Sequence, residues 1–324
     1  MEIEEIKKKK SIQELLEFGV ININKPSGPT SFDVSDFVRK KLNLRKTSHF
    51  GTLDPKVTGV LPIALNRACK LTGYFLGEDK EYVGVMRIHE DISLKEIEKI
   101  IKKKFIGEIT QLPPVKSRVK RQERQREIKR FELLEIGENK KDILFNVECE
   151  GGTYIRKLID DLGKELEIGA HMLELRRIRA GIFTEEDKIY PSINLYDLEK
   201  TAKEYEEGDE ESLRKIIIPA EVIIELHQRV DVKKDNVKQI LTGKPIQNTD
   251  VINTKNLQEN FGTTKSQTVL THRRRGKDFV VKQKLKTGEI VCIFSDNRFI
   301  GMYKVVNDKD VFAKAEFVMQ EIKN

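Results

Sequence analysis

Cysteine is scarce in this sequence: 324 residues contain only Cys69, Cys149 and Cys292, and no two of them form a C-x-x-C pair. This spacing argues against a disulfide framework and against a cysteine-based structural zinc site, and it predicts a reducing compartment. Long apolar runs are also missing, since no stretch approaches the roughly 20 residues that a membrane helix needs. The lysine-rich first ten residues lead into an amphipathic segment and not into a secretory apolar core. We therefore expect a soluble, intracellular protein with no membrane partner.

Positive charge is in modest excess and is unevenly placed. Sixty Lys and Arg against 53 Asp and Glu give a net charge of +7. Between residues 116 and 130, eight cations face only Glu123 and Glu127; they are Lys116, Arg118, Lys120, Arg121, Arg124, Arg126, Lys129 and Arg130. Such a run is often only a solvated face, but one this one-sided favours a surface that binds nucleic-acid phosphates. We expect the first six of these cations to contact RNA.

One carboxylate stands out in the polar loop His49–Gly59. Asp54 directly precedes Pro55, which moves the aspartate away from helical geometry and stiffens the loop. The nearby Lys46 and Lys56 favour the ionised carboxylate. Taken alone, an Asp-Pro pair is more often an ordinary turn than a catalytic site.

The expected elements describe an α+β protein. Apolar alternation predicts strands at 20–24, 80–88, 131–136 and 143–149, and helical spacing predicts helices at 32–42, 66–75, 92–103 and 157–166. Residues 1–18 read as a charged extension that runs into a short helix ending at Gly19. We place a domain boundary near residue 227, with a small β-barrel or sandwich after it that contains a hairpin of 289–294 and 298–305. The polar segment 245–287 is either an insertion or a pair of divergent strands.

Other candidate residues have simpler alternatives. Lys25 lies in a turn-rich loop beside hydroxyls and a helix start, which suits a phosphate backbone but does not match a nucleotide-binding P-loop. A tyrosine on the 80–88 strand, Tyr82, is usually a core residue. Tyr154 and Arg156 follow two glycines where a strand enters a helix, a common place for sites. His171 is more consistent with a structural histidine, because no partner lies at ligand or triad spacing.

The chemistries open to Asp54 are few. A phosphoaspartyl enzyme would need a carboxylate or hydroxyl two residues on, and that position is Lys56. A retaining glycosidase would need a second carboxylate in a comparable loop, and none is present. One carboxylate acting on a substrate held by cations and aromatic rings remains, and chemistry on a flipped nucleic-acid base fits that description.

Five ordered motifs then carry a resemblance to the TruB family of pseudouridine synthases. They are NKPSGPTS (24–31), HFGTLDPKVTG (49–59), KEYV (80–83), GTYIR (152–156) and GAHMLELRR (169–177). Three further segments are similar to the dyskerin branch, the catalytic subunit of box H/ACA ribonucleoproteins: LLEFGV (15–20), MRIHED (86–91) and PPVKSRVKR (113–121). The resemblance implies an α+β catalytic domain with a central mixed, largely antiparallel sheet flanked by helices, followed by a small β-barrel PUA-like domain.

The resemblance also implies roles for single residues. Asp54 would be the catalytic aspartate, Arg156 its salt-bridge partner, and Tyr82 the ring that stacks on the target uracil. Tyr154 and Leu175 would line the pocket, Lys25 would contribute to substrate binding, and His49 would hold the flipped substrate. No cofactor or metal is implied, and whether Asp54 acts as nucleophile or base stays open.

For the whole chain, the resemblance implies a guide-dependent RNA pseudouridine synthase that acts on rRNA with a box H/ACA guide and small accessory proteins. Its domains would be residues 1–227, with the extension 1–18, and residues 228–324, with an insertion around 245–287. Its location would be cytoplasmic in an archaeon and nuclear or nucleolar in a eukaryote. Two alternatives stay open: a guide-free enzyme acting on the tRNA T-arm, and an RNA-binding scaffold inactivated by Phe50, which replaces a usually small residue beside the aspartate.

Overall fold

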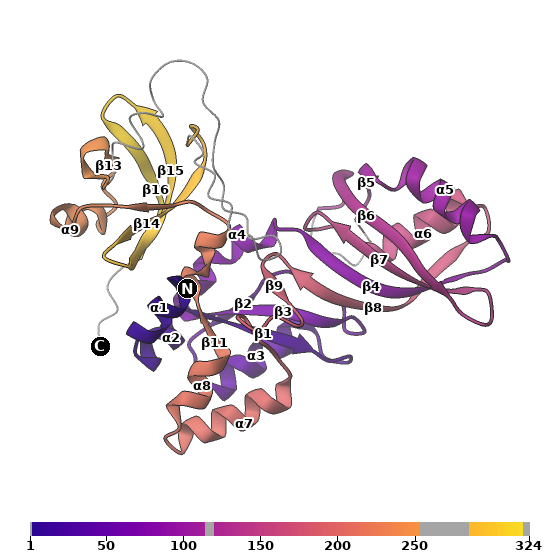
Figure 1. Cartoon of the computed structure of the whole chain (residues 1–324), viewed down its shortest axis with the longest axis horizontal. Helices are drawn as coiled ribbons and strands as arrows, with labels where there is room; N and C mark the ends of the chain where they lie inside the picture. The colour runs from indigo at the N-terminus through magenta and orange to yellow at the C-terminus, as the bar shows by residue number, and fades with distance from the viewer. Residues whose placement is uncertain (1, 114–119, 253–284, 320–324) are drawn as a thin grey trace. The chain divides into compact units, whose positions relative to one another are not determined.

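The computed structural model of the chain (Figure 1) describes residues 2–113, 120–252 and 285–319. The chain forms two compact units, one of Ser11–Ile218 and the other combining Met1–Lys10 with Pro219–Asn324. The division at Ile218 precedes the short 3-10 helix η2 (Ala220–Glu225), whereas the boundary predicted from sequence follows it.

A mixed sheet runs through the larger unit. Its main path is β10-β1-β3-β8-β4-β7-β6-β5, with β11 added beside β1, β2 beside β3 and β9 beside β8. The strands are β1 (Gly19–Lys25), β2 (Thr47–His49), β3 (Thr58–Leu65), β4 (Lys80–Ile88), β5 (Gly107–Gln111), β6 (Arg124–Ile136), β7 (Asp142–Cys149), β8 (Ala170–Ala180), β9 (Phe183–Thr184), β10 (Ser192–Ile193) and β11 (Ile217–Pro219). The pairs β1–β10 and β3–β8 are parallel, whereas the longer ladders are antiparallel. The predicted α+β class with a mixed, largely antiparallel sheet is confirmed.

Helices pack beside this sheet and begin at clear signals. They are α2 (Ile12–Glu17), α3 (Ser31–Lys41), η1 (Asn66–Leu71), α4 (Thr72–Leu76), α5 (Leu94–Lys104), α6 (Ile155–Glu165), α7 (Leu195–Glu206) and α8 (Glu210–Ile216). Ser11, Thr30 and Ser93 each form a capping box, in which the hydroxyl and a carboxylate three residues later satisfy free backbone donors. Helix α6 lies against β8, α5 lies against β6 and α6, and α3 lies against β2 and β3 (Figure 1).

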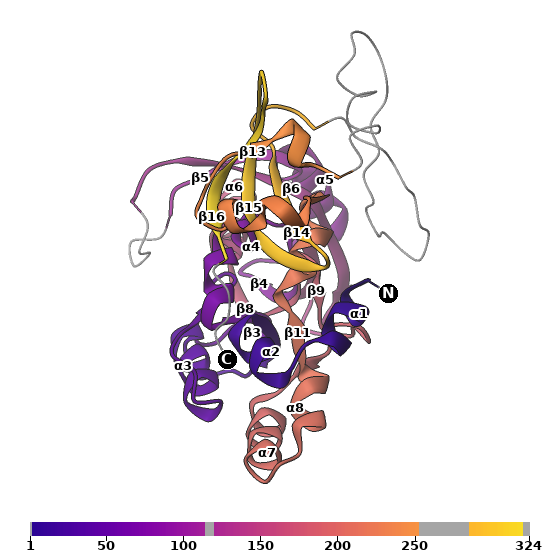
Figure 2. The same cartoon turned by 90° about the vertical axis from the view of Figure 1, so that its left-hand side faces the viewer.

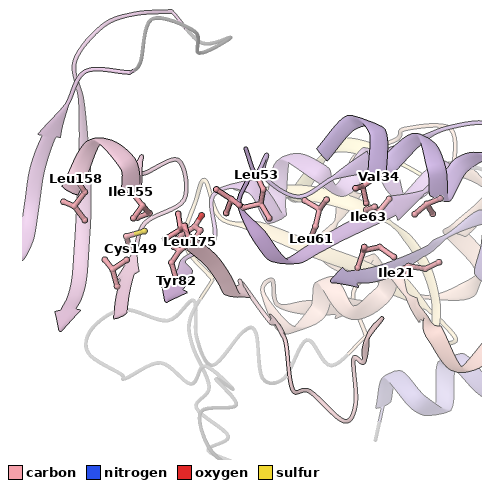
Figure 3. Packing of buried hydrophobic residues seen from close by; sticks show 14 of the residues in the cluster. Ile21, Val34, Leu53, Leu61, Ile63, Tyr82, Cys149, Ile155, Leu158 and Leu175 are labelled. Atoms are coloured by element: carbon pink, nitrogen blue, oxygen red, sulfur yellow. The ribbon is translucent and has the colours of Figure 1, made fainter. Parts of the chain in front are cut away.

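The core follows the strand alternation. Along β4, every second residue from Lys80 to Ile88 is buried and the residues between them are half-buried. This buried face meets the apolar face of α6, including Ile155 and Leu158 (Figure 3). Each fully buried Leu or Ile stabilises the fold by about 1.5–3 kcal/mol, so this layer holds the sheet and α6 in one arrangement.

The C-terminal unit contains a five-stranded sheet with the order β12-β14-β15-β16-β13 (Figure 2). Its strands are β12 (Arg229–Asp231), β13 (Ile246–Gln247), β14 (Ile290–Ser295), β15 (Arg298–Asp308) and β16 (Val311–Val318). The predicted hairpin is present, and its turn residues Asp296 and Asn297 have φ of 49° and 62°, as a tight hairpin turn requires. The N-terminal helix α1 (Glu2–Lys9) belongs to this unit, where Lys10 pairs with the buried Glu221 at 2.5 Å.

Two sequence-based assignments were wrong in detail. The strand expected at 131–136 begins at Arg124 and pairs with β5, which sequence reasoning missed. The helix expected at 66–75 is a 3-10 turn followed by the short helix α4. Most of the segment expected as an insertion, 253–284, lies outside the described residues.

Candidate active site

The Asp54 loop is fixed on both sides of the aspartate. Leu53 and Val57 bury their side chains in the core, with 3% and 4% exposed. The Leu53 N–H donates to Ser31 Oγ at 2.8 Å, and Ser31 Oγ donates back to the Leu53 carbonyl at 3.0 Å. The Asp54 side chain itself stays 55% exposed. A rigid loop therefore presents a solvent-accessible carboxylate. An ordinary turn aspartate would not need flanking residues that are anchored in the core.

The structure corrects the expected role of Lys25. Its side chain is fully buried, and Nζ donates to the carbonyls of Pro26, Pro55 and Val57 at 2.9, 3.0 and 2.8 Å. Burial lowers the pKa of Lys25, while the charge of Asp54 raises it. Because three carbonyls occupy all three donors, Lys25 braces the loop and has no donor left for a phosphate.

Arg177, which sequence reasoning did not single out, also holds the Asp54 loop in place. It is 1% exposed, and its guanidinium donates to the Val60 carbonyl at 2.8 Å and to the Gly51 carbonyl at 3.0 Å. Gly59 of β3 pairs with Arg177 of β8. The backbone φ of Gly59 is +99°, and a Cβ added to Gly59 would lie 2.2 Å from the Arg177 carbonyl oxygen. The glycine is therefore required for this close approach of two backbones.

The predicted partner of Asp54 is in place. Arg156 Nη2 lies 3.1 Å from Asp54 Oδ2, and the two side chains are 60% and 55% exposed. A pair this open to solvent contributes about 0–1 kcal/mol to stability. The pair places a cation directly beside the carboxylate.

Tyr82 and Leu175 lie together next to the loop (Figure 3). Tyr82 is 7% exposed, so the simpler expectation of a core tyrosine also describes it. Burial raises the pKa of Tyr82, whereas the charge of Arg177 and a hydrogen bond to it lower it. Gly84, on the same face of β4, makes room: a Cβ there would lie 2.9 Å from Leu175 Cδ1. A neutral aromatic ring and an aliphatic side chain thus border the aspartate loop.

Tyr154 and His49 border the site from two other elements. Tyr154 is half-buried at the N-cap of α6, and its backbone N–H and carbonyl both hydrogen-bond the Gln111 side chain, at 3.0 and 3.2 Å. Half-buried His49 lies at the end of β2, with Nε2 3.0 Å from Thr52 Oγ1. Sequence reasoning missed Gln111 because it ends a strand that was not predicted.

Phe50 does not intrude on the exposed carboxylate. Its ring is 1% exposed and stacks on Phe75, with centroids 4.4 Å apart and planes 8° apart, and Phe183 packs nearby. The residue is a core anchor of the loop. The geometry gives no support to the alternative that Phe50 inactivates the protein.

Only some of the six cations expected to contact RNA are exposed in the structure. Lys116 and Arg118 lie outside the described residues, whereas Lys120 and Arg121 are exposed and Arg124 is half-buried. Arg126 is largely covered, with 18% of its side chain exposed, and it pairs with Glu150 at 3.7 Å. Its expected RNA contact is therefore corrected to packing against Gly152 beside the start of α6.

The part of the chain that the structure describes holds neither a metal-binding cluster nor a helix that could cross a membrane. Among residues 2–113, 120–252 and 285–319, no group of three or more His, Cys, Asp or Glu side chains could hold a metal ion. In the same ranges, no helix has both the length and the apolar character that a membrane crossing needs.

Comparison with known proteins gives one consistent family. Residues 39–155 match the N-terminal domain of TruB family pseudouridylate synthases, and residues 156–225 match the tRNA pseudouridylate synthase B C-terminal domain. A probable tRNA pseudouridine synthase B from Methanocaldococcus jannaschii is 43% identical over 283 residues, which are 87% of this chain and 81% of the relative. A protein of the same name from Methanopyrus kandleri is 45% identical over 72% of this chain and 67% of the relative.

Solved structures agree with these relatives. One from a Cbf5-Nop10-Gar1 complex matches with a TM-score of 0.79 and 35% identity over 96% of this chain and 88% of the other. Another, from an H/ACA RNP bound to a substrate RNA containing 2'-deoxyuridine, matches with a TM-score of 0.78 and 33% identity over 97% and 89%. The chain belongs to the TruB family of pseudouridine synthases and is an isomerase of the TruB/Cbf5 type.

Proposed function

We propose that this synthase is guide-dependent: it modifies uridines of rRNA that a box H/ACA guide RNA presents, together with small accessory proteins. The observation that carries the proposal is the similarity over 96–97% of the chain to proteins solved in a Cbf5-Nop10-Gar1 complex and in a substrate-bound H/ACA RNP. That similarity extends beyond the catalytic unit into the C-terminal unit. The C-terminal unit would be the PUA-like RNA-binding domain, after a boundary near residue 227.

In this proposal, Asp54 carries the chemistry. The reaction breaks the bond between uracil N1 and ribose C1′, turns the base and joins C5 to C1′; N1 gains a proton and C5 loses one. Asp54 either attacks the substrate or removes a proton, and the 3.1 Å pair with Arg156 aims its carboxylate. The buried Tyr82 keeps its phenol neutral, because burial raises its pKa, and its ring stacks on the uracil.

The remaining site residues hold the flipped nucleotide. Tyr154 and Leu175 form the walls of the pocket, and His49 contacts the substrate from the end of β2. Lys120, Arg121 and Arg124 face the phosphate backbone. Lys25 and Arg177 act only through the loop that they brace.

The second candidate is a guide-free enzyme that modifies the tRNA T-arm. It is favoured by the relatives' names, which read probable tRNA pseudouridine synthase B. The two candidates share the site and differ only in how the RNA is placed.

One assay separates the candidates. The full chain is incubated with tRNA transcript alone and, separately, with a box H/ACA guide, its target RNA and the accessory proteins, and pseudouridine is measured in each. Product that requires the guide supports the proposal, and equal product on bare tRNA overturns it in favour of the second candidate. Asp54→Ala is expected to abolish product in the productive reaction.

A matched control tests the assignment of Asp54. Asp36 on α3 is another solvent-accessible aspartate that pairs with basic side chains, Arg39 and Lys40, both at 2.8 Å. Asp36→Ala is expected to keep wild-type activity. Product that persists undiminished in Asp54→Ala would remove the catalytic role of Asp54.

A further inference from the structure

The start of the eleven-residue helix α6 is not capped by the side chain of its own N-cap residue. Helices α2, α3, α5, α7 and α8 each begin at a residue whose own side chain caps the helix: Ser11, Thr30, Ser93, Asn194 and Asp209. Helix α6 begins at Tyr154, which makes no side-chain cap hydrogen bond. The free backbone groups at this start must find partners elsewhere.

A side chain from strand β5 binds the backbone of Tyr154, whose carbonyl also accepts the first helical hydrogen bond from the Leu158 N–H at 2.9 Å. Gln111, the last residue of β5, accepts from the Tyr154 N–H through Oε1 at 3.0 Å and donates to the Tyr154 carbonyl through Nε2 at 3.2 Å. Gln111 is 2% exposed, so water does not compete for these bonds. A primary amide carries an acceptor oxygen and a donor nitrogen side by side, so it can pair with the N–H and the carbonyl of one residue as a neighbouring strand would.

The two residues that follow Tyr154, Ile155 and Arg156, connect the Gln111 contact to the catalytic aspartate of the proposed function. Ile155 buries its side chain with 4% exposed, and Arg156 reaches back to Asp54. The Arg156 side chain is 60% exposed, so its position depends strongly on the backbone from which it starts. Gln111 binds that backbone two residues earlier, at Tyr154, and Ile155 anchors it between the two.

We infer that Gln111 is a positioning residue for the isomerisation: its clamp on the Tyr154 backbone sets Tyr154 and Arg156 against Asp54. The inference rests on the proposed function, in which Asp54 and Arg156 act on the uridine. Gln111 touches neither the substrate nor the carboxylate. It acts through the start of α6 alone.

Gln111→Ala and Gln111→Met test this role. Both remove the two bonds, and methionine keeps the length and most of the volume of the side chain without burying a charge beside the Tyr154 carbonyl. Single-turnover rates at saturating enzyme are expected to fall about tenfold or more in both variants. The RNA dissociation constant is expected to stay within about twofold, because no RNA contact is lost. Gln125→Ala is the control, since this exposed glutamine bonds Thr110 on the same hairpin at 2.9 Å.

A double-mutant cycle separates positioning from a general loss of structure. In an Arg156→Lys background the guanidinium that Gln111 places is already absent, so Gln111→Ala is expected to cost much less than in wild type. An equal fold-loss in both backgrounds, or a wild-type rate in Gln111→Ala, would overturn the inference. If Gln111→Ala fails to fold, the same cycle is run with Gln111→Met, which refills the volume of the side chain. Full activity of Asp54→Ala would instead count against the proposed function, so the two failures are distinguishable.

Discussion

Buried polar side chains give the active-site loop its shape at the scale of single residues. Lys25 and Arg177 each bind backbone carbonyls of the loop, and Gln111 does the same for the start of α6. Each hydrogen bond contributes about 0.5–1.5 kcal/mol, and some of these carbonyls keep a second donor, the Gly28 N–H for Pro55 and the Leu158 N–H for Tyr154. The three side chains therefore act on the geometry of the site rather than on its chemistry. Sequence can point to a lysine near the site, but it cannot tell a backbone brace from a phosphate ligand.

Sequence also could not show whether Phe50 packs in the core or obstructs the site, and substitutions at Phe50 test its packing role. Because its ring stacks on Phe75 in the core, Phe50→Ala is expected to lower the free energy of unfolding by about 3–5 kcal/mol. Phe50→Leu is expected to cost less, since it refills most of the volume. Urea unfolding measures both values.

Activity per folded molecule is the second readout for Phe50. It is expected to stay near wild type in Phe50→Leu, because the ring does not reach the exposed carboxylate. A large gain in activity in Phe50→Leu would restore the alternative in which Phe50 obstructs the site.

At the scale of elements, the helices and strands that could be predicted are those with a strong local sequence pattern. The apolar alternation of β4, the helix α3 and the hairpin of β14 and β15 were all predicted, because each has a local sequence pattern of its own. The β5–β6 hairpin was missed because charged residues occupy its exposed face: Arg124 to Arg130 reads as a charge run although it is half of a long strand. The pairing of β3 with β8 also could not be predicted, since it joins distant segments through two residue pairs.

That short pairing gives the next prediction. Gly59→Ala would place a Cβ 2.2 Å from the Arg177 carbonyl oxygen at a backbone φ that L-residues disfavour. We expect the β3–β8 contact to open, with soluble yield and melting temperature strongly reduced. Gly73→Ala on α4 is the control, because a Cβ there meets nothing within 4 Å.

The Gly73→Ala variant is the reference against which the melting temperature of Gly59→Ala is compared. Gly73→Ala is expected to be neutral or slightly stabilising, because alanine favours a helix more than glycine does. If Gly59→Ala melts at the same temperature as Gly73→Ala, the close approach of β3 and β8 is not required.

At the scale of the whole molecule, the location of the charge matters more than its total. The net charge of +7 is modest, and the acidic helices α7 and α8 carry exposed lysines of their own. Three of the described cations between residues 120 and 130 pair with carboxylates: Arg126 with Glu150, Lys129 with Asp79 and Arg130 with Glu81. The proposed RNA contacts in the described part of that segment are therefore the exposed Lys120 and Arg121 and the half-buried Arg124.

Two triple variants with the same net charge test this location. Changing Lys120, Arg121 and Arg124 to Gln, or Lys200, Lys203 and Lys215 on α7 and α8 to Gln, removes three charges and leaves +4 in both cases. Each lost phosphate contact flattens the slope of log affinity against log salt by about 0.7–0.9. We expect the first variant to lose up to about 2–3 in slope and the second to keep the wild-type slope, as measured by filter binding to RNA over a range of salt. Equal slopes in the two variants would mean that RNA responds to total charge, and the surface at Lys120, Arg121 and Arg124 would no longer be an RNA contact.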